Sequence, residues 1–191
     1  MTAAPRELPE QALDVLGFWF LELTPEQWFS SSEALDAQIT ERFGSLHERA
    51  ANGDLNDWSS APRARLALII VLDQFSRNIH RGTGKAFAWD DKAQELTVQA
   101  ISLGEDENLG LDERQFLYMP LMHAEDRELQ ALAVEKYQSL ADSAARVTDF
   151  AHTHRDIVDR FGRFPYRNPL LRRESTAEET AFIEDQGNPF S

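Results

Sequence analysis

The stretch that decides the fold is PRARLALIIVLDQFSRNIHRG, residues 62–82. Its residues Leu66–Leu72 are apolar at every position, and Pro62 is of the residue type that favours the first turn of a helix. A helix that is apolar on all sides must also be covered on all sides. The stretch therefore predicts a helix over residues 62–79 at the centre of an α-helical bundle.

Charged residues continue one face of this predicted helix. At about 100° per residue, they fall on the same side as the apolar residues one or two turns earlier. They are Asp73, Arg77, His80 and Arg81. Because buried charge is costly unless it is paired, we expect Asp73 and Arg77 to pair with each other or with groups on another helix.

Helical periodicity recurs on both sides of this centre. It predicts helices over residues 9–20, 32–52, 87–103 and 150–161, one or two helices over 111–143, and a short last helix capped by Ser175 or Thr176. In the first of these, Leu13 and Leu16 are expected to be buried. Residues 105–112 are expected to form an acidic loop. No strand-like alternation is present, so we predict a single all-α domain over residues 1–191, with about eight helices in antiparallel hairpins, as a tetratricopeptide-like array or an irregular bundle.

Composition excludes several classes of function. The 191 residues carry a formal net charge of −14 and no cysteine, which excludes disulfides, thiolate metal sites and a thiol nucleophile. The acidic balance argues against nucleic-acid binding. The N-terminal sequence lacks the basic region of a signal peptide, and no apolar run approaches the roughly 20 residues of a membrane span. We therefore expect a cytoplasmic protein that binds no membrane.

An arginine-rich segment, residues 150–173, runs against this acidic balance. It has the sequence FAHTHRDIVDRFGRFPYRNPLLRR and holds six arginines but only two acids. Its first half predicts a helix in which His154 lies among apolar neighbours, and Gly162 predicts the end of that helix. The arginines either bind an anion or pair with the chain's own carboxylates, for which Asp73, Glu125 and Asp126 are candidates. His154 is either a core histidine or a proton shuttle.

Several long motifs together resemble one bacterial family. They are Phe18–Phe20, Leu72–Gly82 followed by Ala86–Ala88, Tyr118–His123 with Glu125 and Asp126, and His154–Arg155 through Arg160–Asn168. Nearly the whole chain is similar to the family catalogued as domain of unknown function 924. This resemblance implies an all-α fold similar to tetratricopeptide-repeat domains, and it implies no particular reaction. The family usually has proline where this chain has Ser76, so a straighter helix is expected here.

Our leading hypothesis from the sequence is a binding module. In it, the segments around Asp73–Arg81 and Phe150–Asn168 pack together and present arginines to a carboxylate or phosphate group of a small molecule or an acidic peptide. The candidate ligand-binding residues are Asp73, Arg77, His80, Arg81, His123, His154, Arg155, Arg160, Arg163, Arg167 and Asn168. The oligomeric state is left open.

Two alternatives remain. One is a hydrolase-type enzyme in which His80, His123 or His154 acts as a general base beside Asp73, while the arginines stabilise developing negative charge. The other is a structural scaffold with an internal network of ion pairs. No His-x-x-x-His or Glu-x-x-His spacing is present, so we expect no metal and no cofactor.

Overall fold

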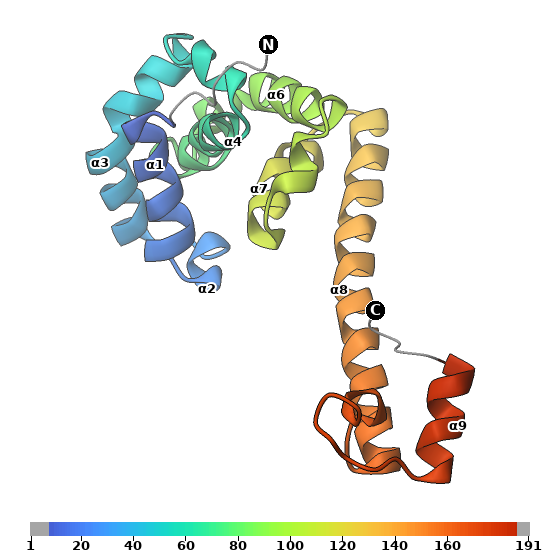
Figure 1. Ribbon diagram of the computed structural model, residues 1–191. Coiled ribbons are helices and arrows are strands. Elements are labelled where there is room, and N and C mark those ends of the chain that lie inside the picture. The colour runs from blue at the N-terminus through green and yellow to red at the C-terminus, as the bar shows by residue number, and fades with distance from the viewer. Residues whose placement is uncertain (1–7, 187–191) are drawn as a thin grey trace, which may run out of the picture. The chain divides into compact units, whose positions relative to one another are not determined.

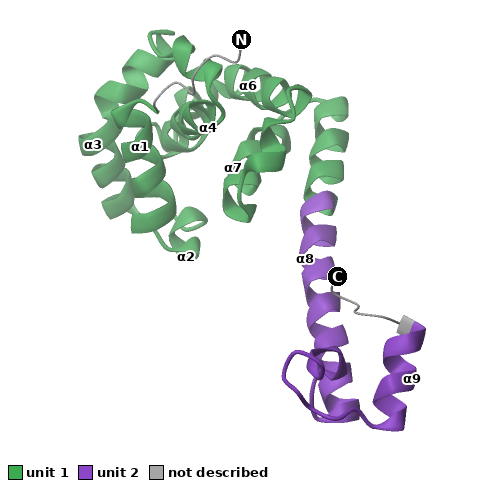
Figure 2. Ribbon diagram, in the orientation of Figure 1, with its two compact units in different colours: residues 1–138 green, residues 139–191 purple. Residues whose placement is uncertain are grey.

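The computed structural model describes residues 8–186, and these residues contain helices, turns and connecting segments but no strand. The chain divides into two compact units, residues 1–138 and 139–191, which are described separately (Figure 2). The prediction of an all-α fold is confirmed. The helices are α1 Glu10–Gly17, α2 Pro25–Trp28, α3 Glu33–Ala51, α4 Pro62–Ile70, α5 Ser76–Ile79, α6 Asp90–Ser102, α7 Leu111–Met122, α8 Arg127–Phe161 and α9 Ala177–Gln186 (Figure 1).

The predicted central helix forms the core of the first unit. Helix α4, a π-helical turn over Val71–Phe75 and α5 follow one another without a break. Every residue from Leu66 to Leu72 is at most 1% exposed. Helix α4 packs against α1, α6 and α7, which accounts for its apolar surface on all sides. The prediction over residues 62–79 is therefore confirmed.

Helix α3 shows most directly how the sequence specifies local structure. Ser32 caps its first turn, with its Oγ accepting a hydrogen bond from the Leu35 backbone N–H. Gly53, just after the helix, has φ +87, a conformation that glycine adopts without strain. Phe43, on the inner face, packs against Phe18 and Phe75. The inner face carries one polar residue, His47, which is 2% exposed.

One expectation about the first unit is wrong. Leu13, expected in the core, is 51% exposed, because α1 turns Ala12, Val15 and Leu16 inward instead. The segment expected to form an acidic loop, residues 105–112, begins with a 3-10 turn over Glu105–Asn108 in which Asp106 is buried. The Tyr118 hydroxyl donates to its carboxylate at 2.6 Å and Lys136 Nζ lies 3.2 Å away, so hydrogen bonds offset the cost of burying this charge.

Helix α8 runs further than the sequence indicated. Periodicity predicted one or two helices up to residue 143 and another from 150, whereas α8 is continuous from Arg127 to Phe161. Exposed acidic residues recur along it every seven positions. Because seven residues are close to two helical turns, successive members of this series lie on nearly the same, solvent-facing side of the helix. They are Glu128, Glu135, Asp142, Asp149 and Asp156. The predicted end of the helix is confirmed by Gly162, whose φ is +66.

The last helix of the second unit, α9, begins with the predicted capping box. Thr176 Oγ accepts a hydrogen bond from the Glu179 backbone N–H at 3.1 Å, and the Glu179 carboxylate accepts one from the Thr176 backbone N–H at 2.7 Å. This reciprocal pair satisfies two donors at the helix start. Phe182 on α9 packs against Phe161 at the end of α8.

No helix within residues 8–186 is both long and apolar enough to cross a membrane.

Candidate active site

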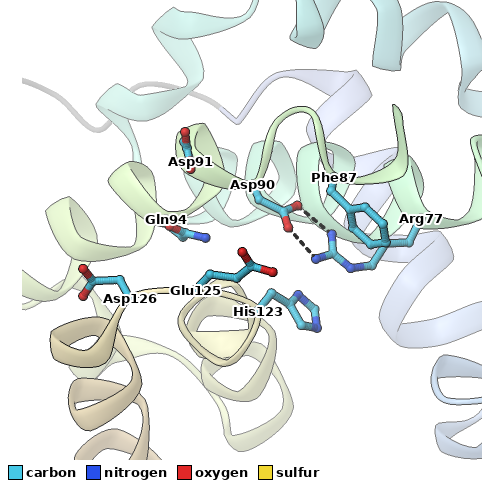
Figure 3. Close-up of a pocket in the computed structure, with 8 residues that line it drawn as sticks. All are labelled: Arg77, Phe87, Asp90, Asp91, Gln94, His123, Glu125 and Asp126. Atoms are coloured by element: carbon cyan, nitrogen blue, oxygen red, sulfur yellow. Dashed lines mark hydrogen bonds and ion pairs between the residues drawn. The ribbon is translucent and has the colours of Figure 1, made fainter. Parts of the chain in front are cut away.

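A pocket of about 580 Å³ opens in the first unit beside the end of the central helical run. Its walls come from α5, from the segment before α6, from the first turns of α6 and from the connection between α7 and α8. Figure 3 shows His123 and Glu125 on one side of it, facing Gln94 and the Arg77–Asp90 pair on the other. The lining residues are Arg77, Phe87, Asp90, Asp91, Gln94, His123, Glu125 and Asp126.

A histidine and a buried carboxylate meet at this wall. His123 Nδ1 lies 2.8 Å from Asp73 Oδ1, and the Asp73 side chain is 1% exposed. The Asp73 carboxylate also forms an ion pair with Arg77 and accepts a hydrogen bond from Gln74, so it acts as an acceptor and His123 Nδ1 as the donor. Nε2 of His123 then carries a lone pair, and none of the described residues is its hydrogen-bond partner.

Helix geometry places both groups. His123 is the C-cap of α7, where the helix ends directly after the Pro120 turn. Asp73 lies in the π-helical turn between α4 and α5, and such turns occur frequently at functional sites. The His123 side chain is 27% exposed and lines the pocket, while its Nδ1 is held by the buried Asp73.

Arg77 crosses the same wall. Its Nη1 lies 3.1 Å from Asp73 Oδ1, and both of its terminal nitrogens donate to the Asp90 carboxylate at 2.9 Å. The Phe87 ring centroid lies 5.4 Å from the guanidinium carbon. The predicted Asp73–Arg77 pair is confirmed. With two carboxylates on it, Arg77 offers the pocket little free positive charge.

The pocket as a whole is acidic. Its lining contains four carboxylates and one arginine. Asp91 and Glu125 are exposed at its mouth, and neither has an ion-pair partner among residues 8–186. Asp126 instead caps α8 by accepting from the backbone N–H groups of Glu128 and Leu129. The surplus of negative charge favours a ligand with a positive group.

The described part of the chain contains no cluster of three or more histidines or carboxylates that could hold a metal ion.

The remaining predicted residues of the first unit lie outside this pocket. Arg81 pairs with the Asp36 carboxylate, which also accepts from Asn78 at 2.8 Å. The Arg81 guanidinium lowers the pKa of Asp36. His80 lies in a second cavity, with its ring 5.2 Å from that of His47.

The predicted residues of the arginine-rich segment belong to the second unit, where most of them pair with nearby acids. Arg155 contacts Asp156 and Asp159, and Arg160 contacts Glu178. The expected partners Asp73, Glu125 and Asp126 are thus not the ones found for these two arginines. That the arginine-rich segment packs against residues 73–81 stays a prediction.

Glu179 is the centre of the second unit's polar contacts. It is 2% exposed, and both of its oxygens accept from Arg163, at 2.6 and 2.7 Å. Asn168, which is fully buried, donates to it at 3.2 Å. The Arg163 hydrogen bonds and the Thr176 backbone N–H lower the pKa of Glu179 to about 2. These contacts position the irregular segment against α9, which is a structural role.

Two further predicted residues make local contacts. His154 is half-buried, and its Nδ1 lies 2.7 Å from the Phe150 carbonyl oxygen one turn earlier. The Phe150 side chain itself is 56% exposed. The Arg167 guanidinium carbon lies 4.5 Å from the ring centroid of Phe164.

Sequence reasoning missed part of the pocket. Phe87 was placed at the start of a predicted helix over residues 87–103, whereas it precedes α6, is 60% exposed and lines the pocket. Asp90, Asp91 and Gln94 were not singled out, because acidic residues in a first helical turn are also typical of ordinary helices. Because Arg77 continues a buried face, the sequence indicated that it needs a polar partner. Only the fold identifies Asp90 as one of those partners.

Comparison with known proteins identifies the family of this chain. A model described as bacterial protein of unknown function (DUF924) matches residues 15–187. The chain belongs to this family. A DUF924-like fold is also supported by a solved structure, that of the protein of unknown function ATU0120 from Agrobacterium tumefaciens. That structure is 39% identical, covers 92% of this chain and 97% of its own, and has a TM-score of 0.66. No curated protein matches the sequence. The DUF924 description names no reaction.

Proposed function

We propose that the pocket is the active site of a hydrolase-type enzyme in which His123 acts as the general base. The observation that carries the proposal is the hydrogen bond between the buried Asp73 and Nδ1 of His123, a residue that lines the pocket; this bond leaves Nε2 with no hydrogen-bond partner in the described chain. A carboxylate in this position fixes the tautomer and orientation of the imidazole. Nε2 can then remove a proton from a water molecule or from a substrate hydroxyl or amine group.

Charge at the pocket supports a substrate with a positive group. Asp91 and Glu125 face the pocket without ion-pair partners in the described chain, whereas Arg77 is already paired with Asp73 and Asp90. An amine or guanidinium on the substrate would replace water at these carboxylates. Gln94 can donate or accept a hydrogen bond beside them.

The size of the pocket fits a small molecule or a single side chain of a peptide. Its volume of about 580 Å³ lies within the roughly 300–1,000 Å³ of typical ligand sites. The role originally expected of the arginines, stabilising negative charge, has less support, because Arg77 is the arginine that lines this pocket and it is paired.

The test is a hydrolysis assay on matched chromogenic substrates. We expect the p-nitrophenyl esters and p-nitroanilides of lysine to be cleaved faster than those of alanine, and those of glutamate to be cleaved slowest. His123→Gln should lower kcat/KM by about 10²- to 10⁴-fold, the usual contribution of a general base. Asp73→Asn should lower it as well, by removing the group that orients the imidazole.

His80→Gln is the matched control, because that histidine lines a different cavity of the same unit and should leave the rate unchanged. Circular dichroism must show that each variant is folded. Equal rates for wild type and a folded His123→Gln variant would reject His123 as the base.

A binding module without chemistry is the second candidate, as expected first from the sequence. The same pocket would then hold a ligand without turning it over, and the unpaired carboxylates favour a cationic one. The anionic ligand expected from the sequence has weaker support, because five of the candidate arginines each have a carboxylate partner: Arg77, Arg81, Arg155, Arg160 and Arg163. These pairs support instead the third alternative, a structural scaffold with an internal network of ion pairs. Thermal shift with phosphate, citrate and an acidic peptide, against spermidine and a lysine-rich peptide, separates these alternatives.

A further inference from the structure

A second cavity of about 350 Å³ lies in the first unit between α3 and the segment that joins α5 to α6. It shares no lining residue with the candidate active site. The side chains that give it chemical character are His47, His80, Lys85 and Trp89. The proposed hydrolase does not use any of them.

Hydrogen bonds fix the tautomer of His47. Its Nε2 lies 2.7 Å from Ser76 Oγ, and Ser76 Oγ already donates its proton to the Leu72 carbonyl oxygen. Ser76 must therefore accept, and His47 Nε2 must carry the hydrogen. Nδ1 of His47 is left with a lone pair, and no described residue donates to it.

The His47 ring is neutral at neutral pH and forms part of the cavity wall. His47 is 2% exposed, yet it lines the cavity. Burial, followed by the nearby His80 and Lys85, lowers the pKa of His47 to about 4. At neutral pH the ring is uncharged, so it accepts a hydrogen bond from an N–H or O–H group of a ligand.

Aromatic rings make up another wall. The Trp89 ring stands perpendicular to His47 at a centroid distance of 4.7 Å and lies at 30° to the His80 ring at 5.6 Å. Gly44, Ala51 and Ile79 add small or apolar surface. Such a lining favours a flat, largely apolar body.

Lys85 supplies positive charge at the same cavity. Its Nζ lies 5.9 Å from the Trp89 ring centroid, and no carboxylate in the described chain forms an ion pair with it. Glu48 lines the cavity as well but forms no ion pair with the lysine. An acidic group on a ligand would give Lys85 a charge-assisted hydrogen bond.

We propose that this cavity is a second ligand site, which takes a small aromatic acid with an uncharged hydroxyl or N–H group. The donor group of the ligand bonds to His47 Nδ1, the ring lies against Trp89 and His80, and the acid pairs with Lys85. The site stands independently of the proposed hydrolase, because its residues and its ligand chemistry are different.

The test uses three probes that separate these contacts. 4-Hydroxybenzoate carries both groups, 4-methoxybenzoate keeps the ring and the acid but lacks the donor, and phenol lacks the acid. We expect saturable binding of 4-hydroxybenzoate in an NMR titration that follows the Trp89 indole N–H, assigned with Trp89→Phe. Loss of one hydrogen bond or of the charged contact should weaken binding about five- to tenfold for each of the other two probes.

Variants test the same contacts from the protein side. Lys85→Met should weaken binding of 4-hydroxybenzoate to the level of phenol, and it changes an exposed residue. His47→Phe keeps the ring but should abolish the preference for the hydroxyl over the methoxy probe. Should His47→Phe not fold, the probe pair on wild type still decides. Equal affinity for the hydroxyl and methoxy probes, or no saturation by roughly 10 mM, would overturn the proposal.

Discussion

Arg77 and Arg81 lie one helical turn apart, yet their surroundings differ. The Arg77 side chain is 21% exposed and contacts the buried Asp73, whereas Arg81, in the turn after α5, is 42% exposed and contacts Asp36, which is 17% exposed. Ion pairs with an exposed partner contribute little to stability, but removing one partner of a buried carboxylate leaves that charge uncompensated. The two arginines therefore have different energetic roles although they are four residues apart.

A pair of substitutions measures this difference. Arg77→Met should lower the free energy of unfolding by about 2–3 kcal/mol, because Asp73 and Asp90 lose their shared cation. Arg81→Met should cost less than about 1 kcal/mol. Urea unfolding followed by tryptophan fluorescence reports on the first unit, since all four tryptophans lie within residues 1–138. Equal losses for the two variants would contradict this account.

His47 predicts a pH dependence of stability. Its pKa is about 4 in the folded chain, below the ordinary value of 6.5, so the unfolded state binds the proton first as pH falls. Stability contributed by the neutral ring is fully present above pH 6.5 and is lost as pH falls toward 4, by up to about 3 kcal/mol. His80, Lys85 and Glu48 line the same cavity as His47.

The measurement compares urea unfolding of wild type and His47→Gln from pH 7 to 4.5. Glutamine keeps a donor for Ser76 but does not titrate, so the variant should lose less stability than wild type across this range. Carboxylates titrate equally in both proteins and cancel in the comparison. Parallel pH curves would show that His47 is not buried in its neutral form.

At the scale of elements, α9 depends on one carboxylate. Glu179 closes the capping box with Thr176 and also receives both Arg163 hydrogen bonds. Helix starts depend on such caps because the first N–H groups lack partners within the helix. Arg163 adds the connection from α9 to the irregular segment before it.

Glu179→Gln should therefore loosen α9 more than Glu178→Gln, whose pair with Arg160 is exposed. Amide exchange of the peptides covering residues 177–186 measures this, and we expect faster exchange only in the first variant. The low pKa of Glu179 also predicts how its contribution to stability depends on pH. Its stabilising effect is present above the ordinary value of 4.5 and is lost as pH falls from there toward about 2. If residues 177–186 exchanged their amides at similar rates in the Glu179→Gln and Glu178→Gln variants, the role of Glu179 as the cap of α9 would be contradicted.

At the scale of the whole molecule, the two units rest on different amounts of apolar burial. The first unit encloses α4, with Leu66–Leu72 fully covered. In the second unit the buried apolar side chains of the described residues are fewer, among them Leu140, Ile157 and Phe182. We therefore expect the first unit to be the more stable of the two.

Hydrogen exchange tests this order. The amides of Leu66–Leu72 should exchange slowest, with protection that equals the free energy of global unfolding measured with urea. Amides of residues 150–186 should exchange through openings of lower free energy. The reverse order, or exchange of α4 by local opening, would contradict the packing described here.

The sequence by itself determined the helices, several of their ends and the buried centre, because these depend on neighbours three or four residues apart. Leu66–Leu72, Ser32 with Gly53, Gly162 and the Thr176–Glu179 box were all predictable for this reason. It also singled out Asp73 and His123, since polar groups within apolar runs need partners.

Tertiary structure alone decided which partners those groups have. Asp73 is 50 residues from His123, and Asp90 is 13 from Arg77. Local periodicity carries no information about such pairings, which arise when helices pack. The same holds for the arginine-rich segment, whose charge is visible in the sequence but whose contacts with Glu178 and Glu179 required the fold. Charge composition therefore left anion binding and internal pairing as alternatives, and the packing of the helices determined which acids the arginines contact.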